Sequence, residues 1–122
     1  MPELAPLDIT AKKITLTNLN HGEIKALLPV TWDTTYTGNE TLTEKVSYQI
    51  DGGPWVLFDT KTHAYDPLTM NYVDSAQLDV TKLPAGGYGI EVVATASDAP
   101  DDKITLADIV VGNQGRTYIK LQ

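Results

Sequence analysis

The sequence predicts an all-β protein in which two antiparallel sheets pack face to face as a β-sandwich. Several short segments alternate apolar and polar side chains at every second position, and Gly, Pro, Asn and Asp separate these segments. No stretch of ten or more residues between such breakers carries the periodicity of a helix. With 122 residues, of which 42% are hydrophobic, the chain can bury one core, so we expect a single domain over residues 1–122.

The first two strands are expected at residues 9–19 and 24–33. In the first segment Ile14 and Leu16 alternate with threonines, and in the second Leu28, Val30 and Trp32 share one face while Thr31 points outward. Polar residues 18–22 end the first strand, and the polar loop 34–43 follows the second. The side chains expected to point inward from these strands are Ile14, Leu16, Leu28, Val30 and Trp32.

The third and fourth strands are expected at residues 44–50 and 55–58, on either side of an Asp-Gly-Gly-Pro turn at residues 51–54. A connection of mixed character follows at residues 59–74, and it is longer than a simple hairpin needs. The side chains expected to point inward from the third strand are Val46, Tyr48 and Ile50.

The later part of the chain brings the expected number of strands to seven or eight. A Leu-Pro-Ala-Gly-Gly corner leads into the most regular alternation in the sequence, and an acidic loop follows it. We therefore expect the core over about residues 9–111, with residues 112–122 as a C-terminal extension. The predicted strands of this part are residues 76–80, 88–96, 103–111 and 117–121, and the acidic loop is residues 97–102.

Three segments together resemble a fibronectin type III or bacterial immunoglobulin-like module: VTWD at residues 30–33, VSYQIDGG at residues 46–53 and LPAGGYGIEV at residues 83–92. The resemblance covers residues 14–111. It implies that Trp32 and Tyr48 pack in the core and that the Tyr88 hydroxyl bonds back to the backbone near Leu83, as in a tyrosine corner. The long connection at residues 59–74 and the tail after Gly112 depart from the family pattern.

Composition excludes several classes of function. The net charge is −7 and Arg116 is the sole arginine, so no basic cluster can neutralise a nucleic-acid backbone. Cysteine is absent, which excludes disulfides, thiolate metal sites and cysteine nucleophiles. No run of eighteen apolar residues occurs, so membrane insertion is not expected.

The search for catalytic or metal-binding motifs predicts no enzyme activity, no cofactor and no metal site. The three serines lack a motif context, and His21 and His63 stand 42 positions apart without ligand spacing for zinc or iron. Asp98, Asp101 and Asp102 cluster in one loop, where solvated turn residues are favoured over calcium ligation and over catalysis.

Aromatic side chains are the remaining candidates for recognition. Trp55 directly follows a turn, and we expect it to be buried. The aromatic residues of the irregular connection could equally serve as core or as a platform for a sugar ring or a protein hot spot. The candidate partner-binding residues are therefore His63, Tyr65, Met70 and Tyr72.

These observations favour a non-enzymatic structural or display protein. A short chain with its own Met1 and no secretion signal suggests an immunoglobulin-like decoration or accessory subunit of a bacteriophage capsid or tail, located in the virion. The alternative is a spacer or ligand-binding module of an adhesin or glycan-degrading protein at the bacterial surface or outside the cell. The expected partners are virion subunits or surface proteins, with a glycan and further copies of the chain in an assembly as additional candidates.

Overall fold

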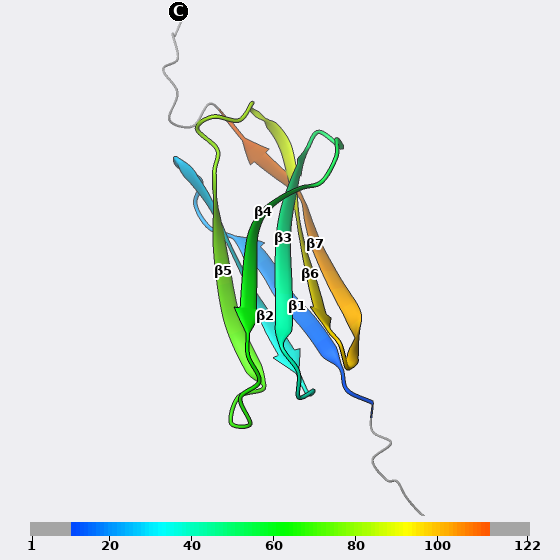
Figure 1. Ribbon diagram of the computed structural model, residues 1–122. Helices are drawn as coiled ribbons and strands as arrows, with labels where there is room; N and C mark the ends of the chain where they lie inside the picture. The colour runs from blue at the N-terminus through cyan, green and yellow to red at the C-terminus, as the bar shows by residue number, and fades with distance from the viewer. Residues whose placement is uncertain (1–10, 113–122) are drawn as a thin grey trace, which may run out of the picture.

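The computed structural model describes residues 11–112 and shows two packed antiparallel sheets (Figure 1). Seven strands and no helix occur in this part of the chain. Accordingly, none of residues 11–112 forms a helix long and apolar enough to cross a membrane. The strands are β1 (Ile14–His21), β2 (Leu27–Tyr36), β3 (Leu42–Ile50), β4 (Val56–His63), β5 (Asn71–Asp79), β6 (Gly86–Ala96) and β7 (Ala99–Val111).

The predicted fold class is confirmed, because the seven strands form a three-stranded sheet in the order β1-β2-β5 and a four-stranded sheet in the order β4-β3-β6-β7. All pairings are antiparallel. This arrangement is compatible with an immunoglobulin-like or fibronectin type III sandwich. Strands β4 and β5 are edge strands of different sheets, and they lie on the same side of the molecule (Figure 1).

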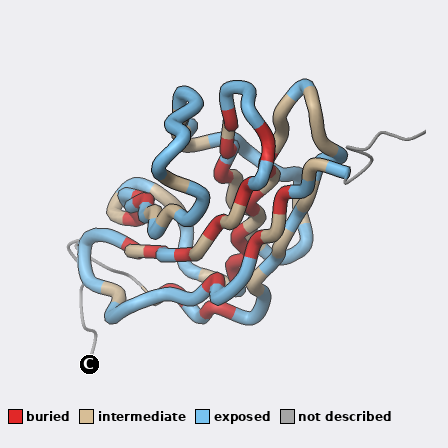
Figure 2. Tube along the Cα trace, turned by 90° about the horizontal axis from the view of Figure 1, so that it is seen from below, coloured by how far each residue is buried: buried red, intermediate tan, exposed pale blue. Residues whose placement is uncertain are grey.

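The core fills the space between the sheets, where the buried positions gather in Figure 2. The twofold periodicity of the sequence explains it, since every second residue of β2 and of β6 points inward. Trp32 and Tyr88 are the largest fully buried side chains, and the partly buried Tyr48 packs against this core with its ring stacked on Tyr88. The inward positions predicted for β1 and β2 are confirmed at Ile14, Leu16, Leu28, Val30 and Trp32.

Two corners at one end of the sandwich are held by defined contacts. Asp51 and Gly52 both have positive φ, and the Gly53 amide donates to the Ile50 carbonyl at 2.9 Å, which makes a tight hairpin turn. The Tyr88 hydroxyl donates to the Pro84 carbonyl at 2.6 Å, so the tyrosine corner implied by the resemblance is present one residue from its expected anchor.

The structure corrects several strand boundaries. Strand β2 continues to Tyr36 and β3 begins at Leu42, so the polar loop predicted at residues 34–43 is confined to residues 37–41. Strand β4 continues to His63 and β5 begins at Asn71, so the irregular connection shrinks from residues 59–74 to residues 64–70. Strand β7 begins at Ala99, which reduces the acidic loop to a two-residue turn. These ends of β4, β5 and β7 were missed because none of their residues is fully buried and most are polar, so no alternation of apolar and polar side chains marks them. The predicted strand at residues 117–121 lies outside the described residues.

Candidate functional site

The candidate site lies between β3, β4 and β5, on the side of the sandwich where the two edge strands face each other. Its central residue is Glu44 on β3, which occupies an inward position between Leu42 and Val46. The Glu44 side chain is 0% exposed, like those of its two apolar neighbours. A fully buried carboxyl in an apolar row is unfavourable unless other groups compensate it.

One oxygen of Glu44 is well satisfied and the other is not. The Trp32 indole N–H donates to Glu44 Oε2 at 3.1 Å, and the Thr34 hydroxyl donates to the same oxygen. Both donors come from β2 in the opposite sheet, so this carboxyl links the two sheets. Glu44 Oε1 is buried and has no hydrogen-bond partner, and it lies 3.5 Å from Nε2 of His63.

His63 and Asp74 complete the cluster from the two edge strands. His63 Nε2 lies 2.8 Å from Asp74 Oδ2, and the imidazole stacks on the Tyr72 ring with centroids 3.9 Å apart. The side chains of His63 and Asp74 are 22% and 12% exposed. The cluster of Glu44, His63 and Asp74 is therefore buried at its β3 end and reaches solvent between β4 and β5.

Burial and neighbouring carboxyl groups make the ionised forms of Glu44 and Tyr72 unfavourable. Burial, together with the neighbouring Asp74 carboxyl, raises the pKa of Glu44 to about 7, although the hydrogen bonds from Thr34 and Trp32 oppose the rise. Burial also raises the pKa of Tyr72, and the nearby carboxylates add to that effect. The cluster therefore favours any species that brings positive charge, either a proton or a cation.

The ligand atoms of Glu44, His63 and Asp74 all lie within 4.8 Å of one another. Two carboxylate oxygens and one imidazole nitrogen at this spacing can hold a divalent cation or share protons. The hydroxyl that contacts the cluster belongs to Thr34, which is buried, so a substrate could not reach it as a nucleophile.

The four predicted partner-binding residues divide into two pairs. His63 and Tyr72 stack on each other and belong to the cluster described above. Tyr65 and Met70 are exposed on the loop at residues 64–70, which projects beyond the strands at the lower end of Figure 1. Leu68 on the same loop, which sequence reasoning missed, is 92% exposed. We refer to Tyr65, Leu68 and Met70 as the apolar tip.

Asp66 gives this loop a fixed shape. Its carboxylate accepts hydrogen bonds from the Leu68 amide at 2.9 Å and from the Thr69 hydroxyl at 3.0 Å. The Thr69 amide donates to the Asp66 carbonyl at 3.0 Å, which closes a turn. The apolar tip is thus presented by an ordered turn.

The burial predicted for Trp55 is wrong, because this residue is 39% exposed. Trp55 precedes β4 and its ring lies over Gly89 of β6, on the outer face of the four-stranded sheet. Because Gly89 has no side chain, the indole ring of Trp55 can pack against the backbone of β6 there. The ring therefore lies on the outer surface of the sheet and not in the core.

The acidic segment at residues 97–102, which was predicted to be a solvated loop, is less exposed than expected. Asp98 accepts hydrogen bonds from the Tyr36 hydroxyl and from the Asn39 amide, the latter at 2.9 Å, and Asp102 accepts one from the Leu16 amide at 2.8 Å. Burial would raise the pKa of Asp98, but these hydrogen bonds outweigh it and lower the pKa. Two of the three acids therefore hold neighbouring segments together, and only Asp101 is exposed as expected.

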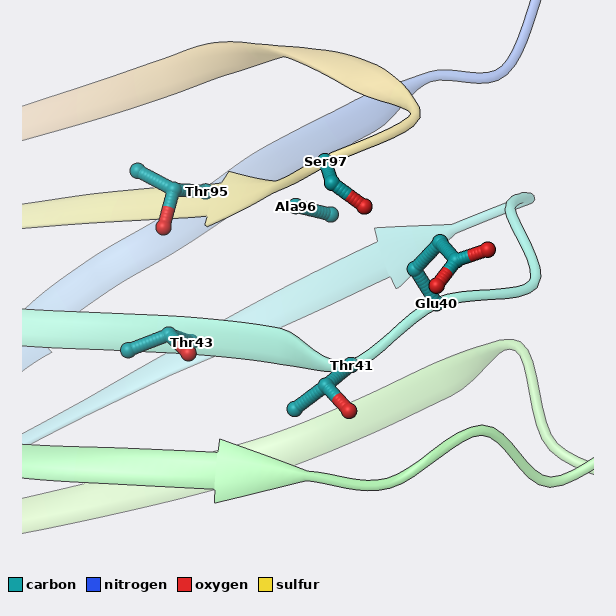
Figure 3. Close-up of a pocket in the computed structure, with 6 residues that line it drawn as sticks. All are labelled: Glu40, Thr41, Thr43, Thr95, Ala96 and Ser97. Atoms are coloured by element: carbon teal, nitrogen blue, oxygen red, sulfur yellow. The ribbon is translucent and has the colours of Figure 1, made fainter.

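A hollow of about 470 Å³ lies where the segment leading into β3 meets the end of β6 (Figure 3). Thr43 and Thr95 are paired across the two strands, and Glu40 supplies its carboxylate. Among the described residues, no lining side chain has a buried atom that lacks a partner. The hollow therefore offers weaker recognition chemistry than the Glu44 cluster. Its lining residues are Glu40, Thr41, Thr43, Thr95, Ala96 and Ser97.

Comparison with known proteins yields a likeness of fold. No family model matches the chain, and no curated protein matches it. Among solved structures, beta-glucosidase 3B from Thermotoga neapolitana, in complex with alpha-D-glucose, is similar with a TM-score of 0.53 and 15% sequence identity. The match covers 79% of this chain and spans 16% of the glucosidase chain. At this identity the likeness supports the two-sheet fold alone.

Proposed function

We propose that this chain is a non-enzymatic immunoglobulin-like module that displays a protein-binding surface. The observation that carries the proposal is the apolar tip: Tyr65, Leu68 and Met70 are exposed together on one loop at the end of the sandwich. Exposed apolar side chains that are grouped on one projection are typical of contact surfaces. Aromatic residues and methionine are also enriched where proteins meet.

The shape of the loop supports the same proposal. Association is opposed by the entropy lost when loops become ordered, and a loop that is already ordered loses less. The Asp66 turn supplies this order before any partner binds. The strands at its base, β4 and β5, are each paired along their length with a neighbour in their own sheet.

The setting proposed first is a bacteriophage virion, with the chain as a decoration or accessory subunit of the capsid or tail. A cysteine-free sandwich is compatible with this setting, because it needs no disulfides to fold in any redox compartment. The partner would be another virion subunit, and further copies of the chain could take part in the assembly.

A second setting is a module of a larger cell-surface or glycan-degrading protein. The likeness to a segment of a beta-glucosidase chain supports this alternative, because there a similar fold makes up a small part of a long polypeptide. In this setting the exposed ring of Tyr65 would contact a sugar, since aromatic faces pack against apolar faces of sugar rings.

The proposal is tested on particles produced by the genome that encodes the chain. Purified virions are searched for the polypeptide by mass spectrometry, and purified protein is then added back to virions from a deletion strain. We expect the wild-type chain to bind at a fixed copy number, and Leu68→Ser combined with Met70→Ser to abolish binding. Val110→Ser is the matched control, because Val110 is also exposed but lies on β7.

Absence of the polypeptide from every particle would contradict the virion setting. Undiminished binding of the double Ser variant would contradict the role of the apolar tip as the contact surface. A glycan array tests the second setting. The second setting is supported if the wild type binds a glycan and Tyr65→Ala does not. The absence of any glycan binding would contradict a glycan-binding role for the chain.

A further inference from the structure

We propose that Glu44, His63 and Asp74 form a binding site for a divalent transition-metal cation, with Zn²⁺ as the cation that fits best. The site would join the two sheets on the side where β4 and β5 face each other. It is separate from the apolar tip and does not depend on the function proposed for that surface.

The unpartnered oxygen of Glu44 is the first argument. Glu44 Oε1 is fully buried, accepts no hydrogen bond, and lies 3.5 Å from His63 Nε2. Buried polar atoms in folded proteins are nearly always satisfied, so an orphaned carboxylate oxygen indicates a missing ligand. Because the oxygen faces the imidazole nitrogen and not the apolar core, that ligand would lie among the three side chains.

The distances are the second argument. His63 Nε2 lies 2.8 Å from Asp74 Oδ2 and 3.5 Å from Glu44 Oε1. Around a tetrahedral Zn²⁺ with bonds of about 2.0–2.2 Å, neighbouring ligand atoms are roughly 3.3–3.5 Å apart. The Glu44–His63 separation already fits, a small rotation of the Asp74 side chain would open the His63–Asp74 separation, and the third pair, Glu44–Asp74, lies within 4.8 Å.

Charge is the third argument. The cluster holds two carboxyl groups and one imidazole, and the lysine nearest along β4, Lys61, forms an ion pair with Asp59 at 3.3 Å. A divalent cation would offset the two carboxylates without the need to protonate Glu44. Trp32 and Thr34 donate to the other Glu44 oxygen, and such outer contacts orient a metal ligand.

The ligand set selects the metal. Ca²⁺ takes six to eight oxygen ligands and Mg²⁺ keeps most of its waters, so neither favours a site with an imidazole nitrogen and two side-chain oxygens. Zn²⁺ accepts this mixed set, binds more tightly than Mn²⁺ or Fe²⁺ at most such sites, and can take a water as its fourth ligand. The partial exposure of His63 and Asp74 leaves a path for the cation and for that water.

A bound cation would connect β3, β4 and β5 at the base of the loop at residues 64–70. His63 is the last residue of β4, and Tyr72, which stacks on it, is the second residue of β5. The cation would therefore fasten both ends of the loop that carries the apolar tip.

Isothermal titration calorimetry with ZnCl₂ tests the site in the full chain after treatment with a chelator. We expect one Zn²⁺ per chain with a micromolar or lower Kd near neutral pH, and no saturable binding of Mg²⁺ or Ca²⁺. His63→Ala and Asp74→Asn should each weaken Zn²⁺ binding more than about tenfold. The matched control is His21→Ala, which removes the other histidine, an exposed residue outside the cluster, and should leave the affinity unchanged.

Folding is checked by circular dichroism of each variant without metal, and Asp74→Asn is included because it preserves the shape of the side chain. Co²⁺ gives a second readout, since its visible absorption bands are intense in a four-coordinate site and should disappear in folded Asp74→Asn. The proposal is overturned by an absence of saturable Zn²⁺ binding up to about 100 μM. It is equally overturned if folded His63→Ala and Asp74→Asn bind Zn²⁺ like the wild type, or if His21→Ala alone removes binding. Because Leu68→Ser should leave Zn²⁺ binding intact, failure of the display function and failure of the metal site can be told apart.

Discussion

Replacement of Glu44 by glutamine should change how the stability of the metal-free protein depends on pH. Burial raises the folded-state pKa of Glu44 from 4.5 to about 7, so the folded chain holds this proton more tightly than the unfolded chain does. The resulting stabilisation is fully present below pH 4.5 and is lost as the pH rises through about 7. Each pKa unit corresponds to about 1.4 kcal/mol, so the loss amounts to about 2–3 kcal/mol between about pH 5 and pH 8.5.

Glutamine resembles the protonated acid and cannot ionise, so Glu44→Gln should lack this dependence. The free energy of unfolding is measured by urea denaturation with a chelator present, at the two pH values. His63, Asp74 and Tyr72 are present around position 44 in both proteins, so the two chains differ only in the side chain at that position. Between the acidic and the alkaline condition, the free energy of unfolding of Glu44→Gln should rise by about 2–3 kcal/mol relative to that of the wild type.

The matched control is Glu23→Gln, because Glu23 is well exposed and its contact with Lys25 is a 4.0 Å surface pair. This control should follow the wild type at both pH values. If Glu44→Gln also follows the wild type, the Glu44 carboxyl does not carry the raised pKa and the reasoning about the cluster is refuted.

The remaining predictions concern the packing of the sandwich. Trp32→Ala should lower the free energy of unfolding by about 3–5 kcal/mol, whereas Trp55→Ala on the outer face should lower it by less than about 1 kcal/mol; equal losses would contradict the placement of the two rings. Tyr88→Phe removes the hydrogen bond to Pro84 and should cost about 1 kcal/mol in urea denaturation, with no loss arguing against the corner contact. Gly52→Ala should cost about 1–2 kcal/mol because φ is +76° there, and Gly52→Asn should cost less; similar melting temperatures for both variants and the wild type would refute the turn.

The fold could be predicted where strands are buried on one face and solvated on the other. Strand β2 alternates Leu28, Val30 and Trp32 with partly or fully solvated positions, so its register follows from the sequence. The ends of β4 and β5 could not be predicted in this way. Residues 59–63 carry polar side chains on both faces of the strand. Even the inward positions at this edge are polar, since Asp59, Lys61 and His63 occupy them.

The candidate site could be predicted only in part. Glu44 was missed, although the alternation that it shares with Val46 on β3 is the signal that could have placed its carboxyl on the inward face. His63 and Tyr72 were singled out by residue type, but their contact depends on the pairing of β4 with β3 and of β5 with β2. No spacing along the chain reports on side chains that meet between two edge strands of different sheets, and so Asp74 was missed.

The most direct test of the central claim is an anomalous difference map at the zinc absorption edge, from crystals of the full chain grown with Zn²⁺. We predict one strong peak about 2.0–2.2 Å from Glu44 Oε1, His63 Nε2 and Asp74 Oδ2, with Trp32 and Thr34 still bonded to the other Glu44 oxygen. A map with Glu44 turned to solvent, or with zinc bound only elsewhere, would contradict the claim.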